Sequence, residues 1–498
     1  MLKKILIANR GEIAVRIIRT CREMGIKTIA IFSKPDRTSP HVLKADEAYC
    51  VGSAPASESY LNIKEIMKIM KNTSVDAVHP GYGFLSENAK FAEEIFKSGI
   101  MWIGPSCSII SMMGDKIQAR KLAEKSGVPV VPGEMKSIKN LNEARKSANE
   151  IGYPILVKAA GGGGGKGMRI IKSQIDLKNA LDRAKSEAKK AFADNRIYLE
   201  KYLEEPHHVE IQIIADNHGN VISLGERECS IQRRYQKIIE ETPSPFITSK
   251  LRKKLSEAAI QIAHSCQYSG AGTVEFLVDQ HQNYYFLEMN TRLQVEHPIT
   301  EMTTGMDLVR EQIRIAAGEK LTLSQKDVQL TGHSIECRIY AENGFNDFTP
   351  STGIINEMTI PQGLGVRFDD GVRVGQKITP YYDPLLGKLI TWGDNRKMAL
   401  NRMSRALYEF HISGIETTIP FCKTLISHPF FEKGMYCTHT LNDIQDDLLN
   451  EITQNGKDYL LAARIGASKL HDKNKIKFVP NYMSNNKWLD SGIKDGIE

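Results

Sequence analysis

The stretch Glu288-Met-Asn-Thr-Arg-Leu-Gln-Val-Glu296 carries a polar side chain at every second position. If this stretch is an extended strand, alternate side chains project from the same face. That face would present two carboxylates, two amides and one guanidinium, from Glu288, Asn290, Arg292, Gln294 and Glu296. Ordinary half-buried strands rarely align such groups, so this row indicates a site for a polyvalent anion and its metal ions.

The residues before this row predict a β-hairpin. Segments 273–278 and 284–287 are rich in β-branched and aromatic residues, and segment 279–283 between them is polar. A hairpin would bring Glu275 close to Glu288, and two carboxylates beside an amide form the oxygen-rich site that Mg²⁺ prefers. The alternative is a hairpin whose acids pair with surface Lys or Arg side chains.

The composition is that of a globular protein with room for about two to four domains. The chain has 498 residues, 41% hydrophobic and 25% charged, and these are ordinary values for a protein with substantial cores. Its net charge of +7 is compatible with anionic ligands. No long basic arm or RNA-reading motif is present, so we expect no nucleic-acid partner.

The cysteine pattern and the N-terminus bear on the compartment. Eight cysteines are dispersed without a Cys-x-x-Cys pair, which argues against a zinc ribbon or a disulfide framework and fits a reducing cytosol. The apolar run at residues 5–8 is too short for a signal peptide or a membrane span. We therefore expect a cytoplasmic protein with no membrane contact.

The N-terminal part predicts a parallel, doubly wound sheet. Strand-like runs at residues 5–8 and 28–32 flank a helix with one apolar face, and residues 75–78 form a further strand. The loop 79–87 after that strand is expected to face a ligand. Gly-x-Gly-x-x-Gly is absent after the first strand, so NAD is not predicted. The next segment, 106–150, is polar and predicted to be helical.

Five consecutive glycines lie between strand-like runs at residues 155–158 and 168–171. Such a loop can bring backbone N–H groups close to phosphate. A Walker A loop would need a glycine and a hydroxyl residue where this chain has Ala160 and Gly167. The remaining interpretations are a lid that closes over ATP and an ordinary flexible loop. Nearby cations favour phosphate, namely Lys116, Lys158 and Lys166.

Several separated segments together match one known family. They are residues 7–14, 79–88, 113–116, 158–168, 200–203, 208–212, 232–237, 288–297, 336–338 and 380–388. Through these segments the chain resembles the biotin carboxylase subunit of biotin-dependent carboxylases, within the ATP-grasp superfamily. The resemblance covers about residues 1–446.

The resemblance implies an ATP-grasp fold of α/β and α+β class. An N-terminal biotin carboxylase domain with a doubly wound parallel sheet would span 1–115, followed by a helical linker and mobile glycine-rich lid at 116–203. The catalytic core and a C-terminal mixed domain would span 204–446. The extension 447–498 has a polar, lysine-rich composition that predicts a partly flexible tail, with one possible helix at 459–465.

The resemblance also implies which residues bind ATP. They are Lys116, Lys158, Gly161, Gly162, Gly163, Gly164, Gly165, Glu200, Lys201, Leu203, His208 and Gln232. Lys116 and Lys158 would contact the phosphates beneath the glycine loop. Residues 200–203 would form the adenine hinge, and His208 and Gln232 would lie near the ribose.

The polar row then divides by role. The implied ligands of Mg²⁺ or Mn²⁺ are Glu275, Glu288 and Asn290. The implied bicarbonate-binding residues are Arg292, Gln294 and the backbone of Val295. The implied catalytic residues are Glu296, Arg338, Arg292 and Lys237.

Each catalytic residue has a distinct implied task. Glu296 would remove the bicarbonate proton, Lys237 would neutralise the transferring phosphate, and Arg338 would stabilise the biotin enolate. From the residues alone, Arg338 could equally form a structural ion pair with Glu336 or Asp383.

The chain lacks the Met-Lys-Met sequence of biotin-accepting domains. The resemblance therefore implies a separate biotinylated carrier protein and a separate carboxyltransferase. By analogy, Arg19, Glu23 and Arg367 would contribute to a homodimer contact. The final carboxyl acceptor stays open among acetyl-CoA, propionyl-CoA and pyruvate.

Two positions depart from the family pattern, and two other functions compete. Tyr235 stands where His is expected, and Lys166 stands where Arg is common, which keeps the charge but loses the bidentate fork. One rival is another bicarbonate-activating ATP-grasp ligase, such as a carbamoyl-phosphate synthetase half. The other is a non-catalytic ATP-binding scaffold, against which the retained polar row argues.

Overall fold

The computed structural model describes residues 2–161, 168–192, 194–344, 346–444, 446–448 and 450. Residues 1–448 form one unit, and the second unit, 449–498, lies almost entirely outside the described residues. The predicted tail and its helix at 459–465, the glycines Gly162 to Gly165 and Lys166 therefore fall outside the described part of the chain.

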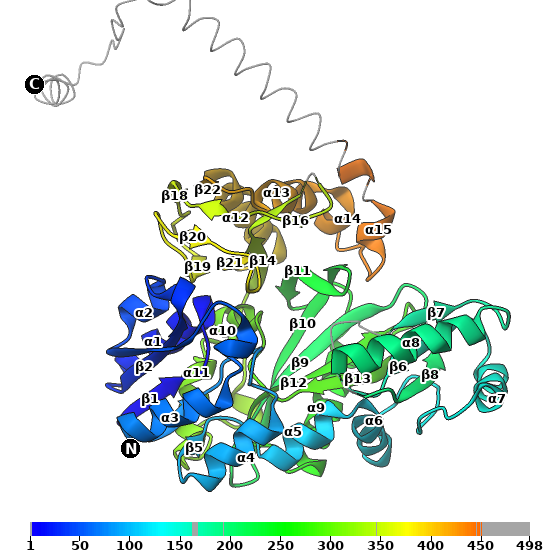
Figure 1. The fold of residues 1–498 in the computed structure, drawn as a ribbon. Coiled ribbons are helices and arrows are strands. Elements are labelled where there is room, and N and C mark those ends of the chain that lie inside the picture. Colours follow the sequence, from blue (N-terminus) through cyan, green and yellow to red (C-terminus); the bar gives the residue numbers. More distant parts are fainter. Residues whose placement is uncertain are drawn as a thin grey trace, which may run out of the picture. The chain divides into compact units, whose positions relative to one another are not determined.

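The N-terminal sheet is parallel and doubly wound, as the sequence predicts. Its strands are β1 (Lys4–Ile7), β2 (Lys27–Ser33), β3 (Glu47–Gly52), β4 (Ala77–His79) and β5 (Met101–Trp102), in the order β3-β2-β1-β4-β5. Helix α1 (Gly11–Glu23) packs on Ile5 and Ile7, whereas α3 (Ile63–Thr73) and α4 (Ala89–Lys97) pack on the opposite face with Leu6 (Figure 1). The alternating side chains of β1 therefore bury both faces of the sheet.

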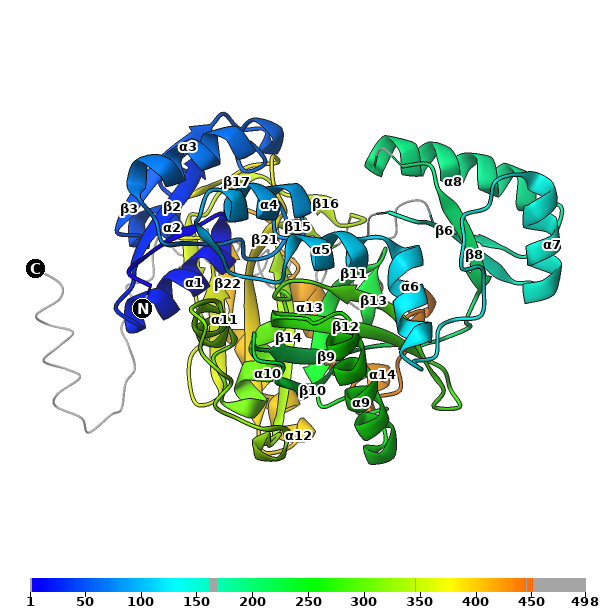
Figure 2. The same ribbon diagram turned by 90° about the horizontal axis from the view of Figure 1, so that it is seen from below.

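A small second sheet has its own core. It is antiparallel in the order β7-β6-β8 and comprises β6 (Ile155–Ala159), β7 (Arg169–Ile171) and β8 (Ile197–Lys201). Helix α8 (Leu177–Phe192) runs along it, and α7 (Leu141–Ile151) packs beside it (Figure 2). The two strand-like runs that flank the glycines thus form the predicted strands.

The segment 106–150 is helical only in part, which corrects the sequence interpretation. Helices α5 (Cys107–Gly114), α6 (Lys116–Lys125) and α7 are separated by a non-helical stretch at 126–140. Pro129 and Pro132 lie in that stretch and disfavour a helix. The chain instead passes along two strands, where Val130 bridges Phe286 and Gly133 bridges Glu200.

An eight-stranded antiparallel sheet carries Glu288 and Asn290, the first two residues of the polar row. Its order is β13-β12-β9-β10-β11-β14-β21-β19, from β9 (His207–Ala215), β10 (Val221–Arg233), β11 (Gln236–Thr242), β12 (Gly270–Val278), β13 (Tyr284–Asn290), β14 (His333–Tyr340), β19 (Val366–Asp370) and β21 (Leu385–Gly393). The predicted hairpin is confirmed as β12–β13, and Glu275 pairs directly with Glu288. Helix α9 (Ser249–Ser265) packs on β9 and β10 through an apolar core.

The remaining elements are short or lie at the edges. The helices are α2 (Pro40–Lys44), α10 (His297–Thr304), α11 (Leu308–Ala316), α12 (Arg396–Glu409), α13 (Ile419–Ser427), α14 (Pro429–Glu432) and α15 (Thr440–Asp443), with 3₁₀ turns at Lys34–Asp36, Ala56–Glu58 and Gln325–Asp327. The strand pairs are β15 (Glu342–Asn343) with β16 (Thr349–Pro350), β17 (Gly353–Ile354) with β20 (Lys377–Ile378), and β18 (Glu357–Thr359) with β22 (His411–Ser413). Among the described residues, no helix combines the length and the apolar character needed to cross a bilayer.

A buried carboxylate ties the large sheet to the C-terminal helices. Glu241 on β11 accepts hydrogen bonds from Arg396 Nε at 2.7 Å and from the Tyr436 hydroxyl at 2.5 Å, and it pairs with His333 at 2.5 Å. Burial alone would raise the pKa of Glu241, but His333 and Arg396 lower it to about 2. The ionised carboxylate therefore stabilises the fold above its unfolded-state pKa, and this stability is lost as the pH falls toward 2.

We expect Glu241→Gln to lower the free energy of unfolding by about 3 kcal/mol at neutral pH, because it leaves Arg396 and His333 without their shared carboxylate. The difference from the wild type should shrink as the pH falls from about 4.5 to about 2. Urea unfolding across a pH series measures it, with the exposed Glu257→Gln as a control that changes little. A difference that stays constant with pH would contradict this assignment.

Candidate active site

A cleft of about 860 Å³ opens between the eight-stranded sheet and the small β7-β6-β8 sheet. Many residues that the sequence singled out line it together. They are Lys116, Lys158, His208, Gln232, Lys237, Glu275, Glu288, Asn290, Arg292, Gln294, Val295 and Arg338. The cleft therefore collects side chains from segments far apart in the sequence.

The β12–β13 hairpin supplies neighbouring oxygen donors. Glu275 and Glu288 are directly paired across the hairpin, and Asn290 Nδ2 donates to Glu275 Oε1 at 2.9 Å. Glu288 also contacts the Lys116 ammonium. Carboxylate and amide oxygens at this spacing fit a hard divalent cation such as Mg²⁺ or Mn²⁺.

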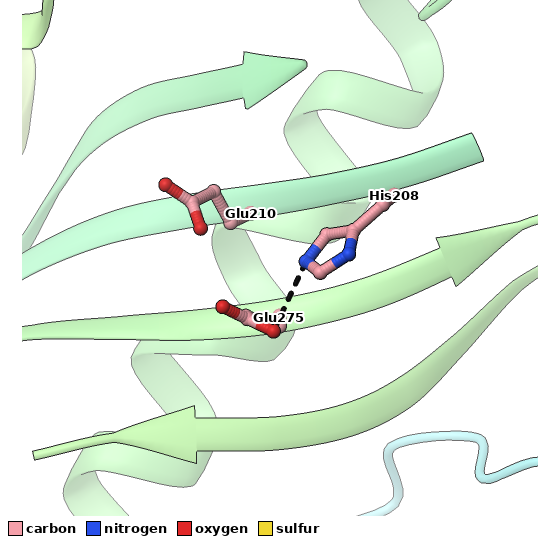
Figure 3. Close-up of side chains that lie close together, drawn as sticks. All are labelled: His208, Glu210 and Glu275. Atoms are coloured by element: carbon pink, nitrogen blue, oxygen red, sulfur yellow. Dashed lines mark ion pairs between the residues drawn. The ribbon is translucent and has the colours of Figure 1, made fainter. Parts of the chain in front are cut away.

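Glu210 joins this group from the neighbouring strand β9. His208, Glu210 and Glu275 can each offer one ligand atom, and these atoms lie within 4.8 Å of one another (Figure 3). His208 Nε2 lies 3.0 Å from Glu275 Oε2, and its Nδ1 lies 2.8 Å from Gln232 Nε2. The carboxylate–imidazole pair fixes the ring beside the oxygen donors.

Lys237 on β11 contacts three buried carboxylates. Its Nζ lies 2.6 Å from Glu210 Oε2, 3.3 Å from Glu275 Oε1 and 2.6 Å from Glu296 Oε1. Burial alone would lower the pKa of Lys237, but the surrounding anionic groups raise it well above its usual value. The side chain is therefore a fixed positive charge in the floor of the cleft.

Glu296 is fully buried between two cations. Besides Lys237, it accepts a hydrogen bond from Arg338 Nη2 at 2.8 Å. Burial would raise the pKa of Glu296, but Lys237, Arg338 and Arg227 hold it well below its usual range. The carboxylate is therefore ionised.

The polar row is a regular strand only as far as Asn290. Strand β13 ends there, and helix α10 begins at His297, so the chain turns between them. Arg292 lies in this turn, where its Nη1 donates to Gln294 Oε1 at 2.9 Å and its Nε donates to Glu87 Oε2 at 2.9 Å. The one-face geometry therefore holds for Glu288 and Asn290, and the turn places the residues beyond them.

Arg338 does not take the structural partners that the sequence left open. Its Nε donates to Glu240 Oε1 at 2.6 Å and its Nη2 donates to Glu296, rather than to Glu336 or Asp383. Burial raises the pKa of Glu240 to about 7 even though Arg338 opposes the shift. Arg338 lines the cleft itself and contacts Glu296, the residue that the sequence proposed as a base.

A second pocket of about 390 Å³ adjoins the cleft and holds the predicted hinge. Glu200, Lys201 and Leu203 line it together with His208, Gln232 and Tyr235. Glu200 itself is buried, and its carboxylate contacts Lys158 and lies 3.1 Å from Arg120 Nη1. The side chain of Glu200 thus holds two cations.

Tyr235 lies at the tip of the β10–β11 hairpin and faces both cavities. Both turn residues, Arg234 and Tyr235, adopt positive φ values of 49° and 65°. Positive φ at both positions is the usual geometry of a two-residue hairpin turn. The departure from His at position 235 therefore lies where it can touch a ligand.

Some site residues were missed by sequence reasoning. Glu210 and Gln212 follow His208 at alternate positions of one strand, so the period-two pattern could have placed them on the same face. Arg227 donates to Glu210 Oε1 at 2.5 Å and to Gln212 Oε1 at 2.7 Å. Glu240 carries no comparable signal, because its partner Arg338 is remote in the sequence.

The geometry agrees with three protein-family matches. The biotin carboxylase N-terminal domain matches residues 1–110, the carbamoyl-phosphate synthase L chain ATP-binding domain matches 115–324, and the biotin carboxylase C-terminal domain matches 336–443. These matches define an ATP-dependent ligase with the ATP-grasp fold.

Individual relatives cover nearly the whole described unit. Biotin carboxylase 1 of Bacillus subtilis is 52% identical over 442 residues, covering 89% of this chain and 98% of that protein. A pyruvate carboxylase subunit of Methanothermobacter thermautotrophicus is 50% identical over 443 residues, covering 89% of this chain and 90% of that protein. The chain belongs to the biotin carboxylase family.

A solved structure agrees at the level of the fold. The biotin carboxylase domain dimer of Hydrogenobacter thermophilus 2-oxoglutarate carboxylase was crystallised with MgADP, ADP and bicarbonate. It is 46% identical, has a TM-score of 0.88, and covers 90% of this chain and 99% of that chain.

We expect Glu200→Gln to lower the free energy of unfolding by about 3–5 kcal/mol, because it leaves the buried Lys158 and Arg120 without their shared carboxylate. Urea unfolding measures this, and Glu204→Gln in the exposed turn that follows is the matched control. Equal stability of the two variants would show that the Glu200 ion pairs contribute little.

Proposed function

We propose that this protein carboxylates biotin on a separate carrier protein, using ATP and bicarbonate, through a carboxyphosphate intermediate. This is the first half-reaction of an acetyl-CoA or propionyl-CoA carboxylase. The observation that carries the proposal is the ionised Glu296, held between Lys237 and Arg338, which both line a cleft that also presents paired oxygen donors. The match to a pyruvate carboxylase component supports the same half-reaction in a two-component pyruvate carboxylase as an alternative.

The first step activates bicarbonate. Arg292, Gln294 and the Val295 backbone hold the anion, and Glu296 removes its proton while a bicarbonate oxygen attacks the γ-phosphorus of ATP. ADP leaves, and carboxyphosphate forms. Mg²⁺ or Mn²⁺ held by Glu275, Glu288 and Asn290 would supply neutralising charge for the phosphates.

The chain's own cations complete this phosphoryl transfer. Lys116 and Lys158 contact the phosphates beneath the glycine loop of Gly161 to Gly165, and Lys237 faces the transferring group. The backbone of 200–203 holds adenine, and His208 and Gln232 lie near the ribose. The lining of the two adjoining cavities supports this division.

The second step transfers the carboxyl group to biotin. Carboxyphosphate breaks into CO₂ and phosphate inside the cleft, and phosphate takes the ureido N–H proton. Arg338 stabilises the developing enolate oxygen while the ureido nitrogen attacks CO₂. The buried placement of Arg338 beside Glu296 supports this role, because both steps must share one enclosed space.

The partners follow from the proposed reaction. They are a biotin carboxyl carrier protein and a carboxyltransferase subunit. We also propose a homodimer to which Arg19, Glu23 and Arg367 contribute, and the dimer of the Hydrogenobacter thermophilus domain supports it. The proposed location is cytoplasmic, because the eight cysteines lack the spacing of a disulfide framework.

The test of the reaction is release of ADP by the purified protein. Release should require bicarbonate and should rise when free biotin is added. A bicarbonate-activating ligase of the carbamoyl-phosphate type would respond to ammonia and ignore biotin, and a scaffold would release none. Absence of biotin stimulation would contradict the proposed function.

We expect Glu296→Gln to lower biotin-dependent turnover by about 10²- to 10⁴-fold, the usual contribution of a general base. ATP affinity, measured by calorimetry, should change little because the amide keeps the shape of the side chain. The exposed Glu319→Gln serves as the control variant. Unchanged turnover in the Glu296 variant would remove it from the role of base.

A further inference from the structure

Three residues from distant segments meet beside the cleft. Glu12 lies on α1, Tyr82 in the loop after β4, and Lys388 on β21. Lys388 Nζ lies 3.1 Å from Glu12 Oε2, and the Tyr82 hydroxyl donates to Glu12 Oε1. Each residue belongs to a segment that carries the family resemblance, yet the reaction above gives none of them a task.

Lys388 also binds the backbone of the bicarbonate segment. Its Nζ donates to the Val295 carbonyl oxygen at 2.8 Å. A peptide unit is planar, so fixing this carbonyl fixes the plane of the peptide that leads into Glu296. Lys388 thus holds the peptide that joins Val295 to Glu296.

The preceding carbonyl is held in the same way. His297 Nδ1 lies 2.7 Å from the Gln294 carbonyl oxygen. Burial lowers the pKa of His297 well below its usual value, so the ring is neutral and donates this hydrogen bond from Nδ1. Two successive carbonyls of the turn are therefore anchored by buried side chains outside the cleft.

The same network reaches the cleft at a second place. Tyr82 and Val295 both line the cavity, whereas Lys388 and Glu12 do not. The Lys388 ammonium lies 5.9 Å from the centre of the Tyr82 ring. One buried charge thus holds two separate parts of the wall, one through a carbonyl and the other through Glu12.

A charge in this place is not explained by stability alone. Lys388 is 0% exposed, and burying an ammonium is costly unless it is well paired. Burial raises the pKa of Glu12 to about 7 even with Lys388 beside it. Glu336 is also buried near Lys388, and neither of its carboxylate oxygens has a hydrogen-bond partner among the described residues.

We propose that Lys388 is a positioning residue for the reaction, which fixes the 294–296 turn through the Val295 carbonyl and fixes Tyr82 through Glu12. The inference rests on the proposed role of this turn in holding bicarbonate. Lys388 touches no reacting atom. It acts through the backbone that orients Gln294 and Glu296.

The test is Lys388→Met with steady-state kinetics for each substrate. The turn should lose its anchor, so KM for bicarbonate should rise by about 10- to 100-fold and kcat should fall. KM for ATP should stay within about twofold, because Lys116 and Lys158 do not contact Lys388. Glu12 can take up a proton when Lys388 is removed, which favours a folded variant.

Two further variants separate positioning from general loss of stability. Arg396→Met removes a partly buried cation from an ion pair with Glu241, and neither residue lines the cleft, so it should lower the unfolding temperature without raising KM for bicarbonate. Lys388→Gln keeps a polar side chain but is shorter and uncharged, so it should lose the contact to the Val295 carbonyl and reproduce the bicarbonate defect. It replaces the Met variant if that one does not fold.

The outcomes distinguish this inference from the proposed function. A wild-type protein whose ADP release ignores bicarbonate overturns both. A wild-type protein that needs bicarbonate, with a Lys388 variant whose KM values for bicarbonate and ATP are unchanged or rise equally, overturns the positioning role alone. A selective rise in KM for bicarbonate in the Lys388 variants, absent in Arg396→Met, supports it.

Discussion

The ammonium of Lys237 among three buried carboxylates is the interaction on which the site depends. Its partners Glu210, Glu275 and Glu296 come from β9, β12 and the turn after β13. Carboxylates buried this close together would repel one another and take up protons without a central cation. The strand order β13-β12-β9-β10-β11 brings these groups together, so the topology of the sheet determines the electrostatics of the cleft.

The same sheet continues beyond this cluster into the C-terminal part. Arg338 on β14 and Lys388 on β21 are directly paired across neighbouring strands. Arg338 contacts the Glu296 carboxylate, and Lys388 contacts the carbonyl oxygen of the preceding residue, Val295. The C-terminal strands therefore complete the site, and the boundary between family domains at residues 324–336 crosses one continuous sheet.

Local patterns predicted much of the fold, because short-range periodicity determines which face of an element is buried. The β12–β13 hairpin and the strands beside the glycines follow from alternating and β-branched residues. The prediction of helix was wrong where Pro129 and Pro132 force an extended path. The roles implied by the resemblance stay predictions, although the cleft collects most of the residues concerned.

Contacts between distant segments could not be derived from the sequence. Arg292 meets Glu87 across 205 positions, and Lys388 meets Val295 across 93. Such pairs depend on how distant segments are arranged in space, and the local pattern of a single sequence does not specify that arrangement. The placement of Glu210 could have been predicted, because it alternates with His208 along one strand and so lies on the same face.

The lysines and acids of the cleft are already partners of one another. Lys116 pairs with Glu288, and Lys237 pairs with Glu275. A phosphate that takes a lysine leaves a carboxylate without its cation, and a divalent ion that takes the carboxylate leaves a lysine without its anion. When the phosphate and the divalent ion bind together, the lysine and the carboxylate exchange partners and no charge is left unpaired. Nucleotide and metal should therefore each strengthen the binding of the other by the same factor, as thermodynamic linkage requires.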